Sequence, residues 1–251
     1  MKWCVEWLKM AYRLWRAHGT ATTAQYAVYL LFAARKENWE YWLQNRVTFE
    51  GRTAVDIGAS FGQWTGFLSK QFEHVAAFEP HTPTYLKLLG RAPNNARIYP
   101  YAVWSCRTSL PLVTYPDSRV NRVTEHELQY AIGEGVWSEQ VEARPLDLFE
   151  LEDVDFMKID AEGAEVQVLQ GAQKTITRDM PMLIIELHSA RARATCSLML
   201  EKWGYDCELV HFPLYRKDDP KYWQRLWIVA KARGIGSFAG ARRVSDLIPT
   251  L

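Results

Sequence analysis

The sequence predicts an α/β fold built on a doubly wound, mostly parallel sheet of seven strands, preceded by an N-terminal helical extension. From residue 53 onward, short apolar and β-branched runs alternate with longer helical stretches. Strands separated by helices are typical of βαβ units, whose parallel sheet is covered on both faces. The seven runs that we interpret as strands are Thr53–Ala59, His74–Glu79, Ala96–Val103, Val154–Asp160, Met182–His188, Tyr205–His211 and Leu226–Ala232.

Helical stretches connect these strands, and one long segment interrupts the alternation. We expect helices over residues 62–71, 82–90, 164–177 and 190–203. Residues 104–150 break the pattern and contain a candidate hairpin at 110–115 and a polar stretch at 116–140. Long irregular insertions in compact domains tend to be functional loops, so we expect this segment to contribute to a site.

We expect three parts: a helical arm at residues 1–48, the α/β domain at 49–233 and a tail at 234–251. Five of the 11 tryptophans precede residue 43, and a helix over residues 2–17 would lie peripherally on an anionic membrane. We favour the alternative, a helical hairpin that packs on the domain or forms a homo-oligomer contact, because its polar stripe includes one acidic residue. That stripe recurs at steps of four and three: Lys2, Glu6, Lys9, Arg13 and Arg16.

The composition excludes several classes of function. Lys and Arg number 30 and Asp and Glu 29, and a net charge of +1 does not suit a protein whose main partner is duplex nucleic acid. The longest apolar run, residues 26–34, is too short for a transmembrane span, which takes about 20 residues. Four cysteines without a CxxC pair are typical of reduced thiols, so we expect a cytoplasmic protein, with a membrane-peripheral location as the alternative.

A glycine-containing turn follows the first predicted strand. Asp56, Gly58 and Gly62 have a DxGxxxG spacing, which differs from the GxGxxG of dinucleotide-binding enzymes. A pyrophosphate needs backbone N–H groups at a helix N-terminus, whereas the sulfonium and ammonium of S-adenosylmethionine favour a carboxylate such as Asp56. Glu79 ends the second strand, where its carboxylate would bind a ribose diol. The alternative is a tight turn with only a structural role.

A second motif spans the fourth and fifth predicted strands. The run KIDAEGAE at 158–165 is followed by Val168-Leu169, Gly171-Ala172 and a strand ending in Glu186-Leu187-His188. This series resembles the FkbM family of S-adenosylmethionine-dependent methyltransferases, whose hallmark is K-I-D-x-E-G-x-E, then v-L-x-G-A, then E-x-H. The first motif is similar to the family's D-I-G-A-N-x-G, with Ser60 in place of the usual Asn. Phe78-Glu79-Pro80 and Leu146-Asp147 also match, and the resemblance covers residues 50–190 and, more loosely, the chain to 232.

The resemblance implies a class I, Rossmann-like methyltransferase domain that binds S-adenosylmethionine. Ala102 and Val103 follow the third strand, where the adenine ring commonly rests in such sheets, although both would otherwise be ordinary core residues. The cofactor-binding residues that we expect are Asp56, Gly58, Ser60, Gly62, Glu79, Ala102, Val103 and Asp160.

Four polar residues at the ends of strands four and five are the candidate catalytic residues: Asp160, Glu162, Glu186 and His188. Alignment of the reactants supplies about 7–11 kcal/mol of a barrier, whereas a general base adds about 10²–10⁴ in rate. We expect Asp160 or His188 to be that base and favour His188, whose ordinary pKa is near neutrality. Glu162 and Glu186 would orient the imidazole or hold sugar hydroxyls. We expect Glu165, on the following helix, to pair with an Arg or Lys instead.

A metal-dependent alternative stays open for the same residues. Asp160, Glu186 and His188 could bind Mg²⁺ or Mn²⁺ and polarise an acceptor hydroxyl. This set of side chains is equally suited to holding a polyol directly.

The resemblance also implies the acceptor, a hydroxyl group on a sugar, a glycan or a natural product. The near-neutral charge and the carboxylate-rich site fit an uncharged, hydroxylated acceptor. Trp104, Trp137 and the 116–140 stretch would stack on a sugar ring or only fill the crevice. The rival functions are a non-catalytic assembly module that retains the fold, and a nucleic-acid methyltransferase.

Overall fold

The computed structural model describes residues 50–114, 121–123, 137–211 and 226–233. The expected helical arm and C-terminal tail lie outside these residues, so their contacts with a membrane or a second subunit stay predictions. Within the described ranges, no helix combines the length and the apolar character that a membrane span requires.

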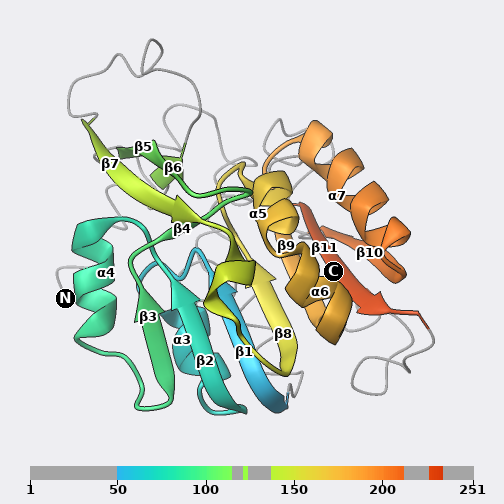
Figure 1. The fold of residues 1–251 in the computed structure, drawn as a ribbon, viewed down its shortest axis with the longest axis horizontal. Helices are drawn as coiled ribbons and strands as arrows, with labels where there is room; N and C mark the ends of the chain where they lie inside the picture. The colour runs from blue at the N-terminus through green and yellow to red at the C-terminus, as the bar shows by residue number, and fades with distance from the viewer. Residues whose placement is uncertain (1–49, 115–120, 124–136, 212–225, 234–251) are drawn as a thin grey trace, which may run out of the picture. The chain divides into compact units, whose positions relative to one another are not determined.

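A seven-stranded sheet forms the centre of the domain, in the order β10–β11–β9–β8–β1–β2–β3 (Figure 1). β2 pairs in parallel with both β1 and β3, and β8 pairs in parallel with both β1 and β9. β11 is antiparallel to β9 and β10, so the predicted mostly parallel, doubly wound sheet is confirmed. The strands are β1 (Gly51–Ile57), β2 (Phe72–Phe78), β3 (Ala96–Tyr99), β8 (Val154–Ile159), β9 (Met182–Leu187), β10 (Tyr205–His211) and β11 (Leu226–Ala232).

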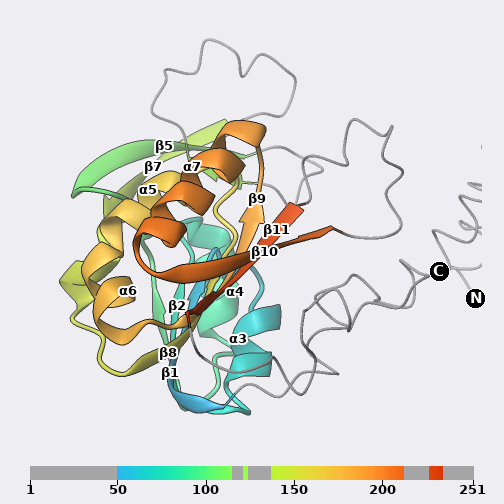
Figure 2. The same ribbon diagram turned by 90° about the vertical axis from the view of Figure 1, so that its right-hand side faces the viewer.

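Helices cover both faces of this sheet (Figure 2). α3 (Gln63–Leu68) and α4 (Thr82–Leu89) lie on one face, and α5 (Glu165–Gly171), α6 (Gln173–Asp179) and α7 (Ala190–Lys202) lie on the other. Strands covered on both sides contain few polar residues, because neither face meets water. The last five residues of β1 are accordingly all buried.

The helix expected at 164–177 is divided into α5 and α6. The division comes directly after Gly171, the last residue of α5. The backbone of Trp104 lies so close there that a Cβ atom on residue 171 would be 2.0 Å from its carbonyl oxygen. Asp147 then caps α6 by accepting the N–H groups of Lys174 at 3.0 Å and Thr175 at 2.9 Å. Asp147 therefore has a structural role at the start of this helix.

The third predicted strand is also divided, which contradicts its prediction as one continuous strand. β3 ends at Tyr99, and Pro100, which has no N–H to donate to a ladder, separates it from β4 (Ala102–Val103). β4 belongs to a second sheet in the order β4–β7–β5–β6. This sheet contains β5 (Thr108–Thr114), β6 (Asn121–Val123) and β7 (Trp137–Arg144). The hairpin expected at 110–115 is wrong, because residues 108–114 form one continuous strand that pairs antiparallel with both β6 and β7.

Candidate functional site

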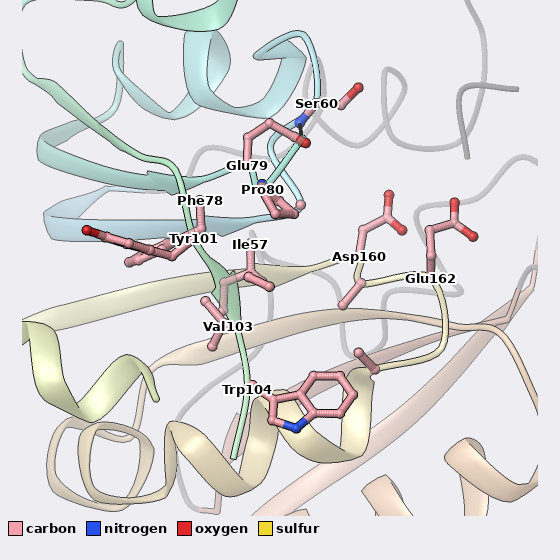
Figure 3. Close-up of a pocket in the computed structure, with 14 residues that line it drawn as sticks. Ile57, Ser60, Phe78, Glu79, Pro80, Tyr101, Val103, Trp104, Asp160 and Glu162 are labelled. Atoms are coloured by element: carbon pink, nitrogen blue, oxygen red, sulfur yellow. Dashed lines mark hydrogen bonds between the residues drawn. The ribbon is translucent and has the colours of Figure 1, made fainter. Parts of the chain in front are cut away.

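A pocket lies at the carboxyl ends of β1, β2 and β8, beside β4 (Figure 3). The strand order of the main sheet reverses between β1 and β8, which is where open α/β sheets bind ligands. Four segments line the pocket: Ile57, Gly58 and Ser60; Phe78 to Pro80; Tyr101 to Trp104; and Asp160 to Glu162 with Ala164.

The turn after β1 requires glycine at two positions. Gly58 has a φ of +74°, and a Cβ atom there would lie 1.8 Å from the carbonyl oxygen of Asp160. Gly62 has a φ of +82°, and its Cβ would lie 2.4 Å from Cδ1 of Leu88. It is the N-cap residue of α3 and does not line the pocket. Ser60 has a φ of 49°, a conformation that Asn adopts more readily. The departure from the family pattern thus falls where the backbone itself is strained.

Glu79 is buried at the end of β2, with 5% of its surface exposed. Its Oε2 accepts the N–H of Ser60 at 2.8 Å, and its Oε1 accepts the N–H of His81 at 2.9 Å. Burial raises the pKa of Glu79 to about 7, against these hydrogen bonds and the charge of Lys158, which lower it. Each carboxylate oxygen accepts about two hydrogen bonds, so each keeps capacity for a ligand hydroxyl.

Asp56 lies beneath the pocket and is fully buried. Its Oδ2 accepts the hydroxyl of Thr65 at 2.7 Å, and its Oδ1 lies 3.3 Å from Nζ of Lys158. Lys158 also donates to the carbonyl oxygen of Gly58 at 2.8 Å and lies 3.8 Å from Oδ2 of Asp160. Asp56 was expected to contact a cationic ligand directly, but the structure places it outside the residues that line the pocket. Asp56 instead holds Lys158, which joins the ends of β1 and β8.

The segment between β3 and β5 forms one wall of the pocket. Ala102 and Val103 both line it, at the position expected for adenine. Tyr101 lines it too, and the guanidinium of Arg144 lies 4.0 Å from the centre of the Tyr101 ring. Trp104 is buried in the core of the second sheet, so it fills space and offers little ring face for stacking. The side chain of Trp137 and most of the 116–140 stretch lie outside the described residues.

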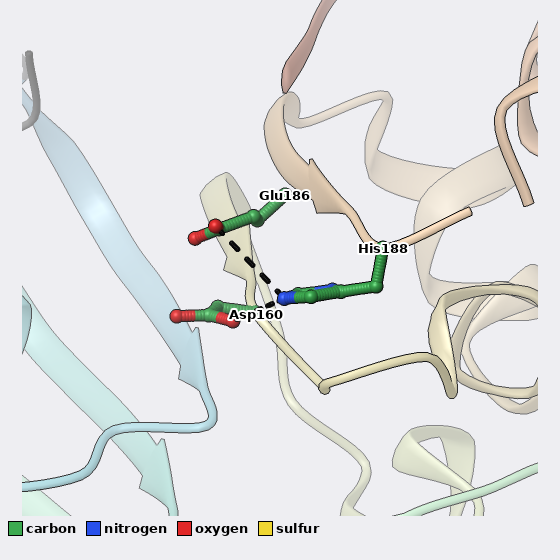
Figure 4. Close-up of side chains that lie close together, drawn as sticks. All are labelled: Asp160, Glu186 and His188. Carbon is green, nitrogen blue, oxygen red and sulfur yellow. Dashed lines mark ion pairs between the residues drawn. The ribbon is translucent and has the colours of Figure 1, made fainter. Parts of the chain in front are cut away.

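Four carboxylates surround His188, which follows β9; Figure 4 shows two of them beside the ring. His188 Nε2 lies 3.2 Å from Oε2 of Glu162, 3.8 Å from Oδ1 of Asp160 and 3.9 Å from Oε1 of Glu186. On the other side of the ring, Nδ1 lies 2.6 Å from Oε1 of Glu165. The four predicted catalytic residues therefore form one cluster, which adjoins the pocket because Asp160 and Glu162 also line it.

Glu165 is the first residue of α5 and is fully buried. Its Oε1 also accepts the N–H of Gly163 at 2.8 Å. The expected pairing with an Arg or Lys is wrong, because His188 occupies that place. Burial lowers the pKa of His188, but the hydrogen bond to Glu165 and the charges of Glu165, Glu162 and Asp160 raise it to about 9. The imidazolium is therefore the stable form of His188 in this cluster at neutral pH.

Three residues important to the site were not selected from the sequence: Lys158, Glu165 and Tyr101. The sequence does indicate a role for Lys158, because a lysine inside an otherwise apolar, buried strand needs a partner of opposite charge. The sequence does not indicate the contact between Glu165 and His188, because that contact depends on a turn in which Glu162 and Gly163 have φ values of 49° and 105°.

The sheet order, the antiparallel β11 and the pocket at the strand ends define a class I methyltransferase fold. The family description "Methyltransferase FkbM domain" matches residues 56–207. The chain therefore belongs to the FkbM methyltransferase domain family.

Several solved structures are similar to this chain. An FkbM methyltransferase from Methylobacillus flagellatus is 20% identical with a TM-score of 0.49, and the match covers 72% of this chain and 43% of that one, less than half its length. A precorrin-6y C5,15-methyltransferase from Geobacter metallireducens is 11% identical (TM-score 0.44; 75% and 83% covered). An rRNA methylase from Streptococcus thermophilus is 12% identical (TM-score 0.42; 76% and 92% covered). No protein with a curated description matches the chain.

Proposed function

We propose that the chain binds S-adenosylmethionine in this pocket and transfers its methyl group to a hydroxyl oxygen of a sugar, glycan or natural-product acceptor. One observation carries the proposal: the pocket is lined both by Glu79, with remaining acceptor capacity, and by two members of the His188 cluster, Asp160 and Glu162. A nucleoside-binding group and a proton-accepting group thus border the same space.

The residues present fit the cofactor. The carboxylate of Glu79 suits the two hydroxyls of a ribose, and the small side chains of Ala102 and Val103 leave room for a flat base beside them. Asp160 and Glu162 offer negative charge to a sulfonium or an ammonium. When bound, S-adenosylmethionine supplies a methyl carbon activated by positively charged sulfur.

The chain's own residues align the acceptor and remove its proton. As the acceptor oxygen bonds to the methyl carbon, the sulfur–carbon bond breaks and the hydroxyl proton must leave. We assign that proton to Asp160, because it lines the pocket, whereas both ring nitrogens of His188 face carboxylates. His188 then acts as a positioning residue that holds Asp160 and Glu162. Alignment remains the larger contribution, about 7–11 kcal/mol, against about 10²–10⁴ in rate for the base.

The chemistry of the acceptor side supports a hydroxylated substrate. Carboxylates are hydrogen-bond acceptors and suit the several hydroxyl donors of a polyol. They repel a phosphodiester, which disfavours nucleic acid as the acceptor.

The test joins calorimetry with an acceptor screen. We expect S-adenosylmethionine and S-adenosylhomocysteine to bind, and a methyl-labelled cofactor to label a glycoside or another polyol detected by mass spectrometry. Asp160→Asn should lower turnover by about 10²–10⁴. Glu73→Gln, which alters an exposed carboxylate at the opposite end of β2, should leave turnover unchanged. Absence of cofactor binding would favour a non-catalytic module, and label found in RNA alone would contradict the acceptor class.

A further inference from the structure

We propose that Asp160, Glu186 and His188 form a binding site for a divalent transition-metal ion, for which Mn²⁺ is the matching probe. One ligand atom from each residue lies within 4.8 Å of the other two. Figure 4 shows both carboxylates beside the same edge of the imidazole ring, the edge that carries Nε2. The three residues come from the ends of the adjacent strands β8 and β9, which fix their backbones relative to each other.

The separations lie between those of neighbouring and opposite ligands around one shared ion. Six ligands at about 2.1 Å from a metal lie about 3 Å from their neighbours and about 4.2 Å from the opposite ligand. Nε2 of His188 lies 3.8 Å from Oδ1 of Asp160 and 3.9 Å from Oε1 of Glu186. These distances are too long for hydrogen bonds, yet they fall inside the range for atoms that coordinate one ion.

A separate feature, the hydrogen bond behind the ring, aims Nε2 at this space. Nδ1 lies 2.6 Å from Oε1 of Glu165, a fully buried carboxylate that the N–H of Gly163 also holds. Ligating histidines almost always donate their other ring N–H to a carboxylate or carbonyl, which fixes the tautomer and directs the remaining lone pair at the metal. Glu165 imposes this arrangement: the proton stays on Nδ1, and Nε2 points toward Asp160 and Glu186.

Ion binding rearranges the cluster in two ways. It displaces the proton from Nε2, as metal binding to histidine generally does. It also replaces the contact of Nε2 with Oε2 of Glu162, now at 3.2 Å. One imidazole nitrogen with two carboxylate oxygens favours Mn²⁺ over Mg²⁺, which prefers oxygen ligands and keeps its waters.

The position of the ion suggests a role, which rests on the proposed function. Asp160 lines the pocket, so an ion on its carboxylate borders the acceptor side. An acceptor hydroxyl on the ion loses its proton more readily. With Asp160 bound to the ion, the proton that we assign to Asp160 in the metal-free site goes instead to Glu162, the other pocket-lining carboxylate of the cluster.

The test measures binding and needs no turnover. Chelator-treated protein is titrated with Mn²⁺, with free Mn²⁺ followed by electron paramagnetic resonance and heat by calorimetry. We expect one ion per chain, weaker competition by Mg²⁺, and a nitrogen coupling from imidazole in pulsed spectra of the bound ion. Glu186→Gln and Glu165→Gln should each weaken binding about 10–100-fold, with Glu165→Gln acting through the ring, and Glu73→Gln should not change it. His188→Ala should abolish the nitrogen coupling.

Two results would overturn the site. One is folded wild-type protein that binds S-adenosylhomocysteine but no stoichiometric Mn²⁺. The other is bound Mn²⁺ without a nitrogen coupling. Neither depends on methyl transfer, so protein that binds Mn²⁺ at a nitrogen and methylates nothing would contradict the proposed function alone.

Discussion

Glu79 is the residue whose protonation we expect to control cofactor affinity. Burial raises its pKa to about 7, and its two oxygens accept the N–H groups of Ser60 and His81. A ribose diol donates to the carboxylate, so cofactor binding favours the ionised form. The affinity should therefore rise as the pH rises through about 7 and level off above it, where the carboxylate is already ionised.

The size of the effect follows from the pKa. One pH unit below the pKa, about a tenth of the Glu79 side chains are ionised, so the affinity falls about tenfold, or about 1.4 kcal/mol. Glu79→Gln removes the titrating group and presents an amide NH₂ where one backbone N–H needs an acceptor. Hydrogen bonds to charged groups contribute about 1.5–3 kcal/mol each, so at pH 8 the variant should bind at least about tenfold more weakly.

Calorimetry with S-adenosylhomocysteine between about pH 5.5 and pH 8 measures both effects. Glu73→Gln is the matched control, because it removes an exposed carboxylate from the same strand and should keep the wild-type slope. A wild-type affinity that does not change with pH over this range would refute the contact between Glu79 and the ribose. A Glu79→Gln variant that retains the wild-type slope would refute it equally.

Substitutions at three further positions, Gly58, Lys158 and Ser60, test the turn and the buried charges, each with a control or compensating variant where the chain offers one. Gly58→Ala should lower the free energy of unfolding by about 2 kcal/mol or more, because of its positive φ and its steric clash, whereas Gly66→Ala, with open space at its Cβ, should raise it by up to about 1 kcal/mol. Lys158→Met should lower it by about 3–5 kcal/mol by leaving Asp56 as an uncompensated buried charge, and adding Asp56→Asn should restore part of the loss. Ser60→Asn should raise it by about 0.5–1 kcal/mol, because Asn tolerates positive φ.

Urea denaturation followed by circular dichroism measures all of these changes. Similar destabilisation by both glycine substitutions would contradict the steric argument at Gly58. A double variant at 56 and 158 no more stable than Lys158→Met would contradict the buried pair. A less stable Ser60→Asn variant would show that backbone strain at this position is not what distinguishes the two residues.

The strands of the main sheet were predictable because each is an apolar run buried on both faces. β1, β2, β8 and β9 each lie within two residues of their predicted bounds. The third strand was not predictable, because residues 96–103 have β-forming character on both sides of Pro100. Only tertiary packing shows that the chain leaves one sheet for another there.

The site was predictable at the level of strand ends and not at the level of partners. Asp160 and His188 follow adjacent strands, so the sequence places them together. Asp56 was misplaced because side chains alternate between the faces of a strand. Ile57 lines the pocket, whereas Asp56 reaches Thr65 of α3. The contact between Glu165 and His188 depends on turn geometry that composition and spacing do not encode.

Residues from two separate sheets line the pocket, and the second sheet contributes through residues 101–104. β4 pairs with β7 and not with β3, so that wall is anchored by the paired strands β5 and β7, while Gly58 and Glu79 follow β1 and β2 of the main sheet. Changes in β5 or β7 can therefore reshape this wall and leave the turn after β1 intact. We therefore expect the residues of this wall to vary among related chains independently of the turn after β1.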